Sequence, residues 1–454
     1  MLRKHLAFIG IIACVFVAFI DYMIVNNALP SIQHAFGVSV ISLQWISNIY
    51  SIILASTLIL FGRIADVFGK KHIFYSGMLL LAIGSLAAGF APTFAWLIFF
   101  RLIQSLGVAA LIVIAPPMIQ NIYQENSQKP MSIYASVGGL GLVLGPTIGG
   151  LIISHWRWQG VFWVNIPFLI ISLIICLIAL NDKEDLHLEK ISFYNLDLFG
   201  NVFLCLTLSS FIFVLIQLEQ FGFNKQAIIS GIIFLISLPC LIIIEKKHTK
   251  PTLNLTHLKS CDFRLAMLSN TAAGTIVSCG MFFSPIFLQK ILGYSPIMSG
   301  IILLAFALVV LFASPIFGCL PKSVTPKHML RLCLLSAFIG ALAYITFFYH
   351  SILALGIIGF ALTGLTLSIS NVYSALSAIA GLGEENAGAS VGTIYATFNM
   401  TAAITLGIST IIYHDLFNIR HLTMTKSFAF TFIFVAGFTG VVWLLGFIGK
   451  KRVS

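Results

Sequence analysis

Long runs of apolar residues divide the sequence and constrain its fold more than any other feature. A helix needs about 20 apolar residues to cross the hydrocarbon core of a bilayer, and these runs are long enough. They are continuous rather than alternating with polar residues, which favours helices over the strands of a membrane barrel. We therefore predict an all-α polytopic membrane protein with fourteen spans. The predicted spans lie near residues 7–29, 42–62, 72–92, 95–117, 132–154, 161–180, 197–218, 227–244, 265–288, 297–318, 329–348, 352–375, 388–412 and 428–448.

The composition excludes several other classes of protein. The chain of 454 residues is 59% hydrophobic and only 9% charged, whereas soluble domains contain about 25% charged residues. A soluble enzyme, a disordered protein and a disulfide-stabilised scaffold are therefore excluded. The Cys residues form no CxxC pair, and no two His have the spacing of helical metal ligands. We predict no bound metal.

The Lys and Arg residues predict the orientation of the chain. An even number of spans places both termini on one side of the membrane. Nineteen of the 25 Lys and Arg residues lie in the gaps on that side, and five lie in the opposite gaps. Because basic residues accumulate on the cytoplasmic side, we expect a multi-pass protein of the cytoplasmic (inner) membrane with both termini in the cytoplasm. The net charge of +11 then reflects topology, and we expect no nucleic acid as a partner.

Two charged residues lie well inside the predicted spans. Asp21 is the only acid placed deep in a span, and Arg101 is the only base. Counted from the outer ends of their spans, both lie roughly 10–12 Å below the outer boundary. Charges inside a bilayer are costly and are functional candidates, and a low dielectric favours the protonated form of a carboxylic acid. We expect a proton or substrate site at this depth; the alternative is an ion pair that only holds two helices together.

The loop after the second predicted span carries a motif that reads GRIADVFGKK from Gly62. Glycines permit a tight turn, and basic residues anchor a loop at the cytoplasmic face. The stretch closely resembles the loop signature of the major facilitator superfamily. The resemblance implies that an acid here contacts a neighbouring helix end and an Arg to latch the inner gate. The gating residues would be Gly62, Arg63, Asp66, Gly69 and Lys70.

Two further stretches resemble the drug:proton antiporters of that superfamily. The sequence reads DYMIVNNALP from Asp21 and RLIQSLG from Arg101, and these runs are similar to family patterns in the first and fourth helices. The resemblance implies that Asp21 and Arg101 couple proton movement to transport. It also implies that Asn26 and Gln104 line the substrate path.

The fifth predicted span contains a glycine-rich motif that reads GLVLGPTIGG from Gly141. Small residues four apart let two helices approach closely, and a Gly-Pro step bends or loosens a helix. Ordinary helix packing is therefore one interpretation. The motif also resembles the antiporter motif that distinguishes exporters from importers in the superfamily. That resemblance implies a gating role for Gly145, Pro146, Gly149 and Gly150.

Two turns resemble the fourteen-helix branch of the superfamily. They read WRWQGVFWVNIP from residue 156 and LQKILGYSPIMSG from residue 288. The resemblance implies a major-facilitator fold with an N-terminal six-helix half at 1–180 and a C-terminal six-helix half at 263–454. Residues 181–262 would form a linker with two additional transmembrane helices. In such transporters the substrate site lies at the interface of the repeated units.

The predicted function is that of a proton-coupled secondary transporter, an antiporter that exports small amphipathic or drug-like molecules. It would use the proton motive force and no cofactor, and it is not predicted to be an enzyme. No second acid lies deep in the later spans, so a site for dications is not expected. Apolar, aromatic and small polar walls suit amphipathic compounds. Candidates for the substrate path in the C-terminal half are Asn270, Phe282, Asn371, Tyr395 and Asn399.

A close alternative is export of an endogenous metabolite, such as a siderophore, by the same mechanism. The fifth-helix motif disfavours an importer, and the spans lack the continuous polar ring of a channel. They also lack the clustered acids, His or Cys that a membrane enzyme needs at one face. The expected partners are the small-molecule substrate, H⁺ and the lipid bilayer. A periplasmic adaptor is an optional further partner, and we leave the oligomeric state open.

Overall fold

The computed structural model describes residues 2–123, 128–180, 197–248, 260–318, 320, 324–382 and 387–447. Fourteen helical segments of this part are long and apolar enough to cross a membrane, which confirms the predicted number of spans and the all-α fold class. The first six spans comprise α1 (Leu2–Ile24), η1 (Val25–Ala28), α2 (Leu29–Phe36), α3 (Val40–Phe68), α4 (Lys70–Gly89), α5 (Phe94–Tyr123), α6 (Gln128–Trp156), α7 (Gly160–Trp163) and α8 (Asn165–Ala179). The remaining helices are α9 (Leu198–Phe221), α10 (Lys225–Lys247), α11 (Cys261–Lys290), α12 (Pro296–Gly318), α13 (Pro326–His350), α14 (Leu353–Leu382), α15 (Ala387–His414), η7 (Asp415–Ile419) and α16 (Met424–Leu445).

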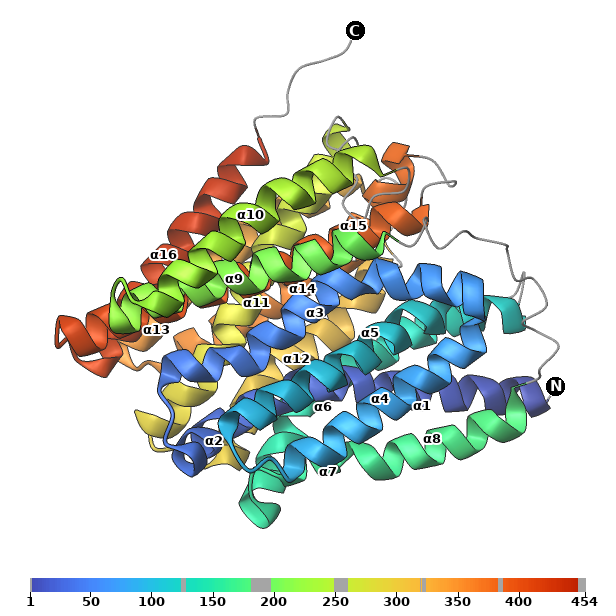
Figure 1. The fold of residues 1–454 in the computed structure, drawn as a ribbon, viewed down its shortest axis with the longest axis horizontal. Coiled ribbons are helices and arrows are strands. Elements are labelled where there is room, and N and C mark those ends of the chain that lie inside the picture. The colour runs from blue at the N-terminus through green and yellow to red at the C-terminus, as the bar shows by residue number, and fades with distance from the viewer. Residues whose placement is uncertain are drawn as a thin grey trace, which may run out of the picture.

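The long helices lie side by side along one common direction (Figure 1). An even number of segments is long and apolar enough to cross a membrane, and a chain that crosses with each of them in turn has the start of α1 and the end of α16 at the same end of the bundle. We call this the termini end and the opposite one the far end. We call α1–α8 the N-terminal half and α11–α16 the C-terminal half.

The first span is longer than the predicted run, which ends near residue 29. Its helix passes through the 3₁₀ turn η1 and continues as α2 to Phe36. Pro30 does not interrupt it, because Pro30 stands in the first turn of α2, where no backbone N–H is needed for the helix. All four residues of η1, including its two Asn residues, are buried inside the bundle.

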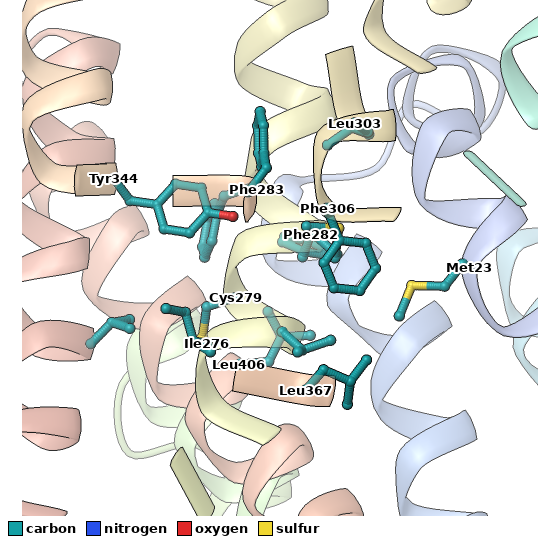
Figure 2. Close-up of a cluster of buried hydrophobic side chains, with 14 of the residues drawn as sticks. Met23, Ile276, Cys279, Phe282, Phe283, Leu303, Phe306, Tyr344, Leu367 and Leu406 are labelled. Carbon is teal, nitrogen blue, oxygen red and sulfur yellow. The ribbon is translucent and has the colours of Figure 1, made fainter. Parts of the chain in front are cut away.

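The largest hydrophobic core lies where the two halves meet. It contains residues of α1, η1 and α3 together with many residues of α11–α16. Figure 2 shows Phe282 and Phe306 of the C-terminal half on the side that faces Met23 of α1. Phe282 also packs edge-on against Phe283, with the ring centroids 5.1 Å apart. A second core lies within the N-terminal half, around α1, α3, α4, α5 and α8.

The halves contact each other through α6 with α12 and through α3 with α15, and η1 and α2 contact α11. The central helix α9 lies against both α3 and α15, and α10 lies against α9. Only 22% of the apolar window of α10 is buried, so this helix lies at the periphery of the bundle. Its exposed apolar side chains are suited to lipid.

Candidate functional site

Asp21 and Arg101 meet in the interior of the N-terminal half. Asp21 lies on α1 and Arg101 on α5, and their side chains are 0% and 1% exposed. An N–H at Nη1 of Arg101 donates to Oδ2 of Asp21 over 2.9 Å, so the contact is both an ion pair and a hydrogen bond. The structure thus joins the two residues that the sequence singles out by depth. Their role in proton coupling stays a prediction.

Two amides also contact the Asp21 carboxylate. Nδ2 of Asn165, on α8, donates to Oδ1 of Asp21 over 2.7 Å, and Nε2 of Gln104 donates to the same oxygen over 3.1 Å. Both amides also donate to Oγ of Ser85 on α4. Oε1 of Gln104 accepts from Nη1 of Arg101 over 3.1 Å, which turns the Gln104 N–H groups toward the carboxylate. Four helices therefore contribute to one buried polar cluster.

Close packing of α4 on α5 positions this cluster. A Cβ at Gly84 would lie 2.8 Å from the backbone N of Gln104, and a Cβ at Gly107 would lie 2.5 Å from the backbone N of Leu81. Only glycine lets the two backbones approach so closely. The turn of α4 that carries Ser85 is therefore held against the turn of α5 that carries Gln104.

The groups that contact the Asp21 carboxylate stabilise its charged form. Arg101 supplies an opposite charge, and the two amides supply N–H donors. Both kinds of contact compensate a buried carboxylate for the water that it has lost. The arrangement is the ion-paired state of the site. Binding of a proton at Oδ2 requires the contact with Arg101 to weaken.

Aromatic rings cover the guanidinium group of Arg101. Its Cζ atom lies 4.4 Å from the centroid of the Tyr50 ring, on α3, and 5.9 Å from that of Phe162, on α7. The Tyr50 ring in turn packs against Tyr22 with the centroids 5.3 Å apart. Nη1 has two acceptors, whereas Nε has none in the described part of the chain. The cation is therefore held by π faces as well as by oxygen acceptors.

The substrate-path candidates of the N-terminal half lie close to this cluster. Gln104 belongs to it directly. Asn26 lies in η1, five residues after Asp21, and its side chain is 7% exposed. Its Oδ1 accepts from Oγ of Ser47 on α3 over 3.4 Å. Asn26 thus links η1 to α3, one residue before Asn27.

The candidates of the C-terminal half are dispersed over three helices. Asn270 and Asn399 each donate to a backbone carbonyl of their own helix, α11 and α15 respectively. Phe282 is buried in the core between the halves. Asn371 is partly buried on α14, and Tyr395 is 39% exposed on α15. The described contacts join none of these five to the Asp21 cluster, and their role in the substrate path stays a prediction.

The loop motif lies at the junction of α3 and α4. Gly69 adopts a φ of 92°, a conformation that favours glycine, and α4 begins directly after it at Lys70. Gly62 lies in the last turns of α3 and is partly buried. The side chains of Arg63 and Asp66 lie outside the described residues. The latch assigned to this motif therefore stays a prediction.

The glycine motif of α6 faces α1 over several turns. A Cβ at Gly141 would lie 2.9 Å from the backbone O of Phe16, and a Cβ at Gly149 would lie 2.7 Å from the backbone O of Ile24. Gly145 has the same orientation, with the backbone O of residue 20 at 3.2 Å from an added Cβ. Glycines four apart therefore let α6 lie directly on the backbone of α1, as small residues do in membrane helix pairs.

Asn27 joins the two halves at the far end. Its fully buried Nδ2 donates to the backbone O of Pro146 over 3.0 Å and to that of Pro296 over 2.8 Å. Its Oδ1 accepts from Nε2 of Gln289 over 2.9 Å. A Cβ at the neighbouring Gly150 would lie 2.4 Å from the backbone O of Pro296. One amide therefore ties η1 and α6 to the C-terminal half, and the far end of the interface is closed.

Apart from Gln104, sequence reasoning missed the neutral polar side chains of these clusters. Ser85, Tyr50 and Asn27 carry no charge, and in an apolar run they look like any other tolerated polar residue. Asn165 and Gln289 stand within the two quoted turns, so the turn patterns were the available signal. Among the described residues no group of three or more His, Cys, Asp or Glu could hold a metal ion.

Comparisons with known proteins identify similar sequences and a similar fold. A family model described as Major Facilitator Superfamily matches residues 11–256. Multidrug resistance protein Stp of Mycobacterium tuberculosis is 27% identical over 386 residues, which cover 84% of this chain and 70% of that protein. The Tetracenomycin C resistance and export protein of Streptomyces glaucescens is 26% identical over 396 residues, which cover 82% of this chain and 72% of that protein. A crystal structure of the peptide transporter POT in complex with sulfate has a similar fold, with a TM-score of 0.72, 15% identity and coverage of 97% and 93%.

Proposed function

The chain belongs to the major facilitator superfamily, in its drug-exporter branch, and we propose on this premise that it is a proton-coupled antiporter. It exports small amphipathic or drug-like molecules across the cytoplasmic membrane in exchange for protons. The termini end of the bundle faces the cytoplasm, because nineteen of the 25 basic residues lie on that side. The far end faces the periplasm or the outside of the cell.

The observation that carries this proposal is the buried Asp21 cluster. A carboxylate with one cationic partner and two amide donors is a group whose charge changes with a single proton. It lies in a segment that continues directly into η1, where Asn27 holds the two halves together. Protonation of Asp21 and the closure of the far end therefore act on the same span of the chain.

The described contacts correspond to one state of an alternating-access cycle. The far end is closed and Asp21 is ion-paired, as expected after the proton has left toward the cytoplasm. In that state the transporter takes up substrate from the cytoplasm. After the halves rock, the far end opens, the substrate leaves and Asp21 is protonated from outside. Entry of one proton contributes about 2.3 kcal/mol per 100 mV and about 1.4 kcal/mol per pH unit.

The substrate class follows from the surroundings of the site. The core between the halves is apolar and aromatic, which suits lipophilic compounds with few polar groups. Relatives named for resistance to multiple drugs and to Tetracenomycin C support the same class. The second candidate is export of an endogenous metabolite such as a siderophore. It is favoured by Arg101, because a buried cation can pair with an anionic group of the substrate while Asp21 is protonated.

Everted membrane vesicles test the proposed function with ethidium as the probe. Vesicles containing the protein and energised by respiration should accumulate ethidium, and nigericin, which collapses the pH difference, should release it. Vesicles without the protein are the control. Accumulation that survives nigericin would contradict proton coupling. A strain without the protein separates the two substrate classes, because it becomes either dye-sensitive or defective in secretion of an iron chelator.

A further inference from the structure

Protonation of Asp21 creates a problem for its partner. The charge of Arg101 is balanced by one carboxylate, and Arg101 is 1% exposed. Removing one member of a buried ion pair leaves an uncompensated charge, which is strongly destabilising. A cycle in which Asp21 takes up a proton therefore needs another group that stabilises the guanidinium in place. Otherwise the cation would leave its position or prevent protonation.

Tyr50 and Phe162 are placed to do this. The Tyr50 centroid lies 4.4 Å from Cζ of Arg101, and the Phe162 centroid lies 5.9 Å from it. Both distances are within the range in which a ring face attracts a cation. The two rings belong to α3 and α7, whereas the cation belongs to α5. The positions of the rings are therefore set by other helices than the one that carries Arg101. Both ring residues are buried, which strengthens the attraction by excluding water.

We propose that Tyr50 and Phe162 form an aromatic cradle that keeps Arg101 in place when Asp21 is protonated, and that Tyr50 is a positioning residue for proton coupling. This inference rests on the proposed function. It adds a requirement that the ion pair alone does not contain. The cradle makes the protonated state of the site accessible without moving the cation.

The cradle favours one protonation state over the other. While Asp21 is ionised, the pair has little net charge, and the carboxylate offsets part of the attraction between the cation and the ring. Once Asp21 is protonated, the full positive charge acts on the ring faces. The cradle therefore raises the affinity of Asp21 for a proton. Among the described groups around Asp21, those that can carry a charge are Arg101, Tyr50 and Tyr22. The neutral ones are Ser85, Gln104, Phe162 and Asn165.

Infrared titration of the purified full-length protein measures this effect without a substrate. The carbonyl band of a protonated carboxylic acid is recorded against pH, and the spectrum of Asp21→Asn is subtracted to isolate the band of Asp21. We define the midpoint as the pH at which this band is half-formed. The midpoint in Tyr50→Leu should lie about one pH unit below that in Tyr50→Phe, a tenfold loss of proton affinity that is due to the ring. Phe162→Leu should lower the midpoint less, because its ring is farther from the cation.

Two control variants keep the test specific. Tyr50→Phe retains the ring and removes the hydroxyl, which interacts with the Asp21 carboxylate and stabilises its charged form, so the midpoint in this variant should not fall below that of the wild type. Tyr344→Leu removes a buried tyrosine ring of the C-terminal half, which packs on Phe348 and Phe360. It should leave the midpoint unchanged whatever it does to stability. A midpoint in Tyr50→Leu that equals that of Tyr50→Phe would overturn the cradle, and so would an equal decrease in both variants.

The same experiment separates failure of the cradle from failure of the proposed function. If the Asp21 band titrates in the wild type and its midpoint is the same in Tyr50→Leu as in Tyr50→Phe, the cradle alone is contradicted. Absence of any Asp21-dependent band over the pH range of the folded protein contradicts proton binding itself. In that case the Asp21–Arg101 pair would only hold two helices together.

Discussion

Asp21 accepts hydrogen bonds from Arg101, Gln104 and Asn165, which lie on α5 and α8. The amides have a consequence opposite to that of the aromatic cradle. They donate to the ionised form of the acid and so lower its affinity for a proton. The proton affinity of the site is a balance between donors that stabilise the carboxylate and rings that stabilise the cation left behind by protonation.

Removal of one amide tests the donor side of this balance. In Asn165→Leu the carboxylate loses its shortest hydrogen bond, of 2.7 Å. A hydrogen bond to a charged group contributes about 1.5–3 kcal/mol, so the midpoint of the Asp21 band should rise by about one pH unit or more. Asn201→Leu is the control, because the amide of Asn201 donates to the backbone of Asp197 on α9. A midpoint that falls or stays the same in Asn165→Leu would refute the claim that this amide lowers the proton affinity of Asp21.

At this scale the sequence predicts the two charged residues and Gln104, but not the other neutral partners. Asp21 and Arg101 stand out because an intramembrane charge is costly, and the equal depth of the two agrees with their contact. Ser85 and Asn165 cost little in an apolar run, so their positions carry no comparable signal. Their geometry depends on how tightly α4, α5 and α8 pack, which only the folded chain reveals.

The element that connects proton binding to the far end is the first span. Asn27 of η1 uses all of its amide groups in contacts with Pro146, Pro296 and Gln289. Asn27→Ala removes these bonds and leaves carbonyl groups of α6 and α12 without their donor. We therefore expect this variant to favour the state in which the far end is open. Spin labels at His34 on α2 and Ser295 before α12, in a background without native Cys, measure the separation of the halves.

In Asn27→Ala the distribution of label distances should shift toward longer values. Gln217→Ala is the matched control, since its amide at the same end accepts from Asn224 and links only α9 to α10. It should show the distances of the wild-type protein. If Asn27→Ala shows them too, the amide does not hold the far end closed.

The glycine face of α6 gives a second prediction at this scale. A Cβ at Gly150 would lie 2.4 Å from the backbone O of Pro296, so α6 and α12 cannot keep their distance in Gly150→Ala. Overpacking of this kind costs about 1–3 kcal/mol, and thermal unfolding of the purified protein should begin at a lower temperature. Gly437→Ala on α16 is the control, because a Cβ there meets nothing within 4 Å. Equal unfolding temperatures for the wild type and Gly150→Ala would contradict the assigned contact.

Helix boundaries were predicted less well than helix number. The run that was expected to end near residue 29 continues to Phe36, and α5 passes through Pro116 and Pro117 to Tyr123. Proline is a helix terminator in water, but in a bundle neighbouring helices and side chains satisfy the backbone groups that it frees. The sequence alone does not show where such neighbours lie.

For the whole molecule, fourteen spans could be predicted because the bilayer imposes a length on every crossing helix. The pairing of α3 with α15 and of α6 with α12 could not be predicted from the sequence. These helices are apolar on most of their surface, so no single face marks the partner. The individual contacts of α9 with α3 and α15 have the same origin, and only the packed structure reveals them.

The orientation of the bundle is a prediction for the whole molecule. Alkaline phosphatase, which is active only outside the cytoplasm, should be inactive when fused to either terminus. It should be active when fused after Arg157, in the turn between α6 and α7 at the far end. Active enzyme at the termini would reverse the assigned direction of transport.

The central claim is that movement of a proton through Asp21 drives export. Proteoliposomes with an imposed pH gradient test it most directly. Ethidium uptake into the vesicles, by protein molecules inserted inside out, is followed for the wild type and for Asp21→Asn. The wild type should concentrate ethidium against its gradient, and the variant should at most equilibrate it. Uphill transport by Asp21→Asn at the wild-type level would contradict the account.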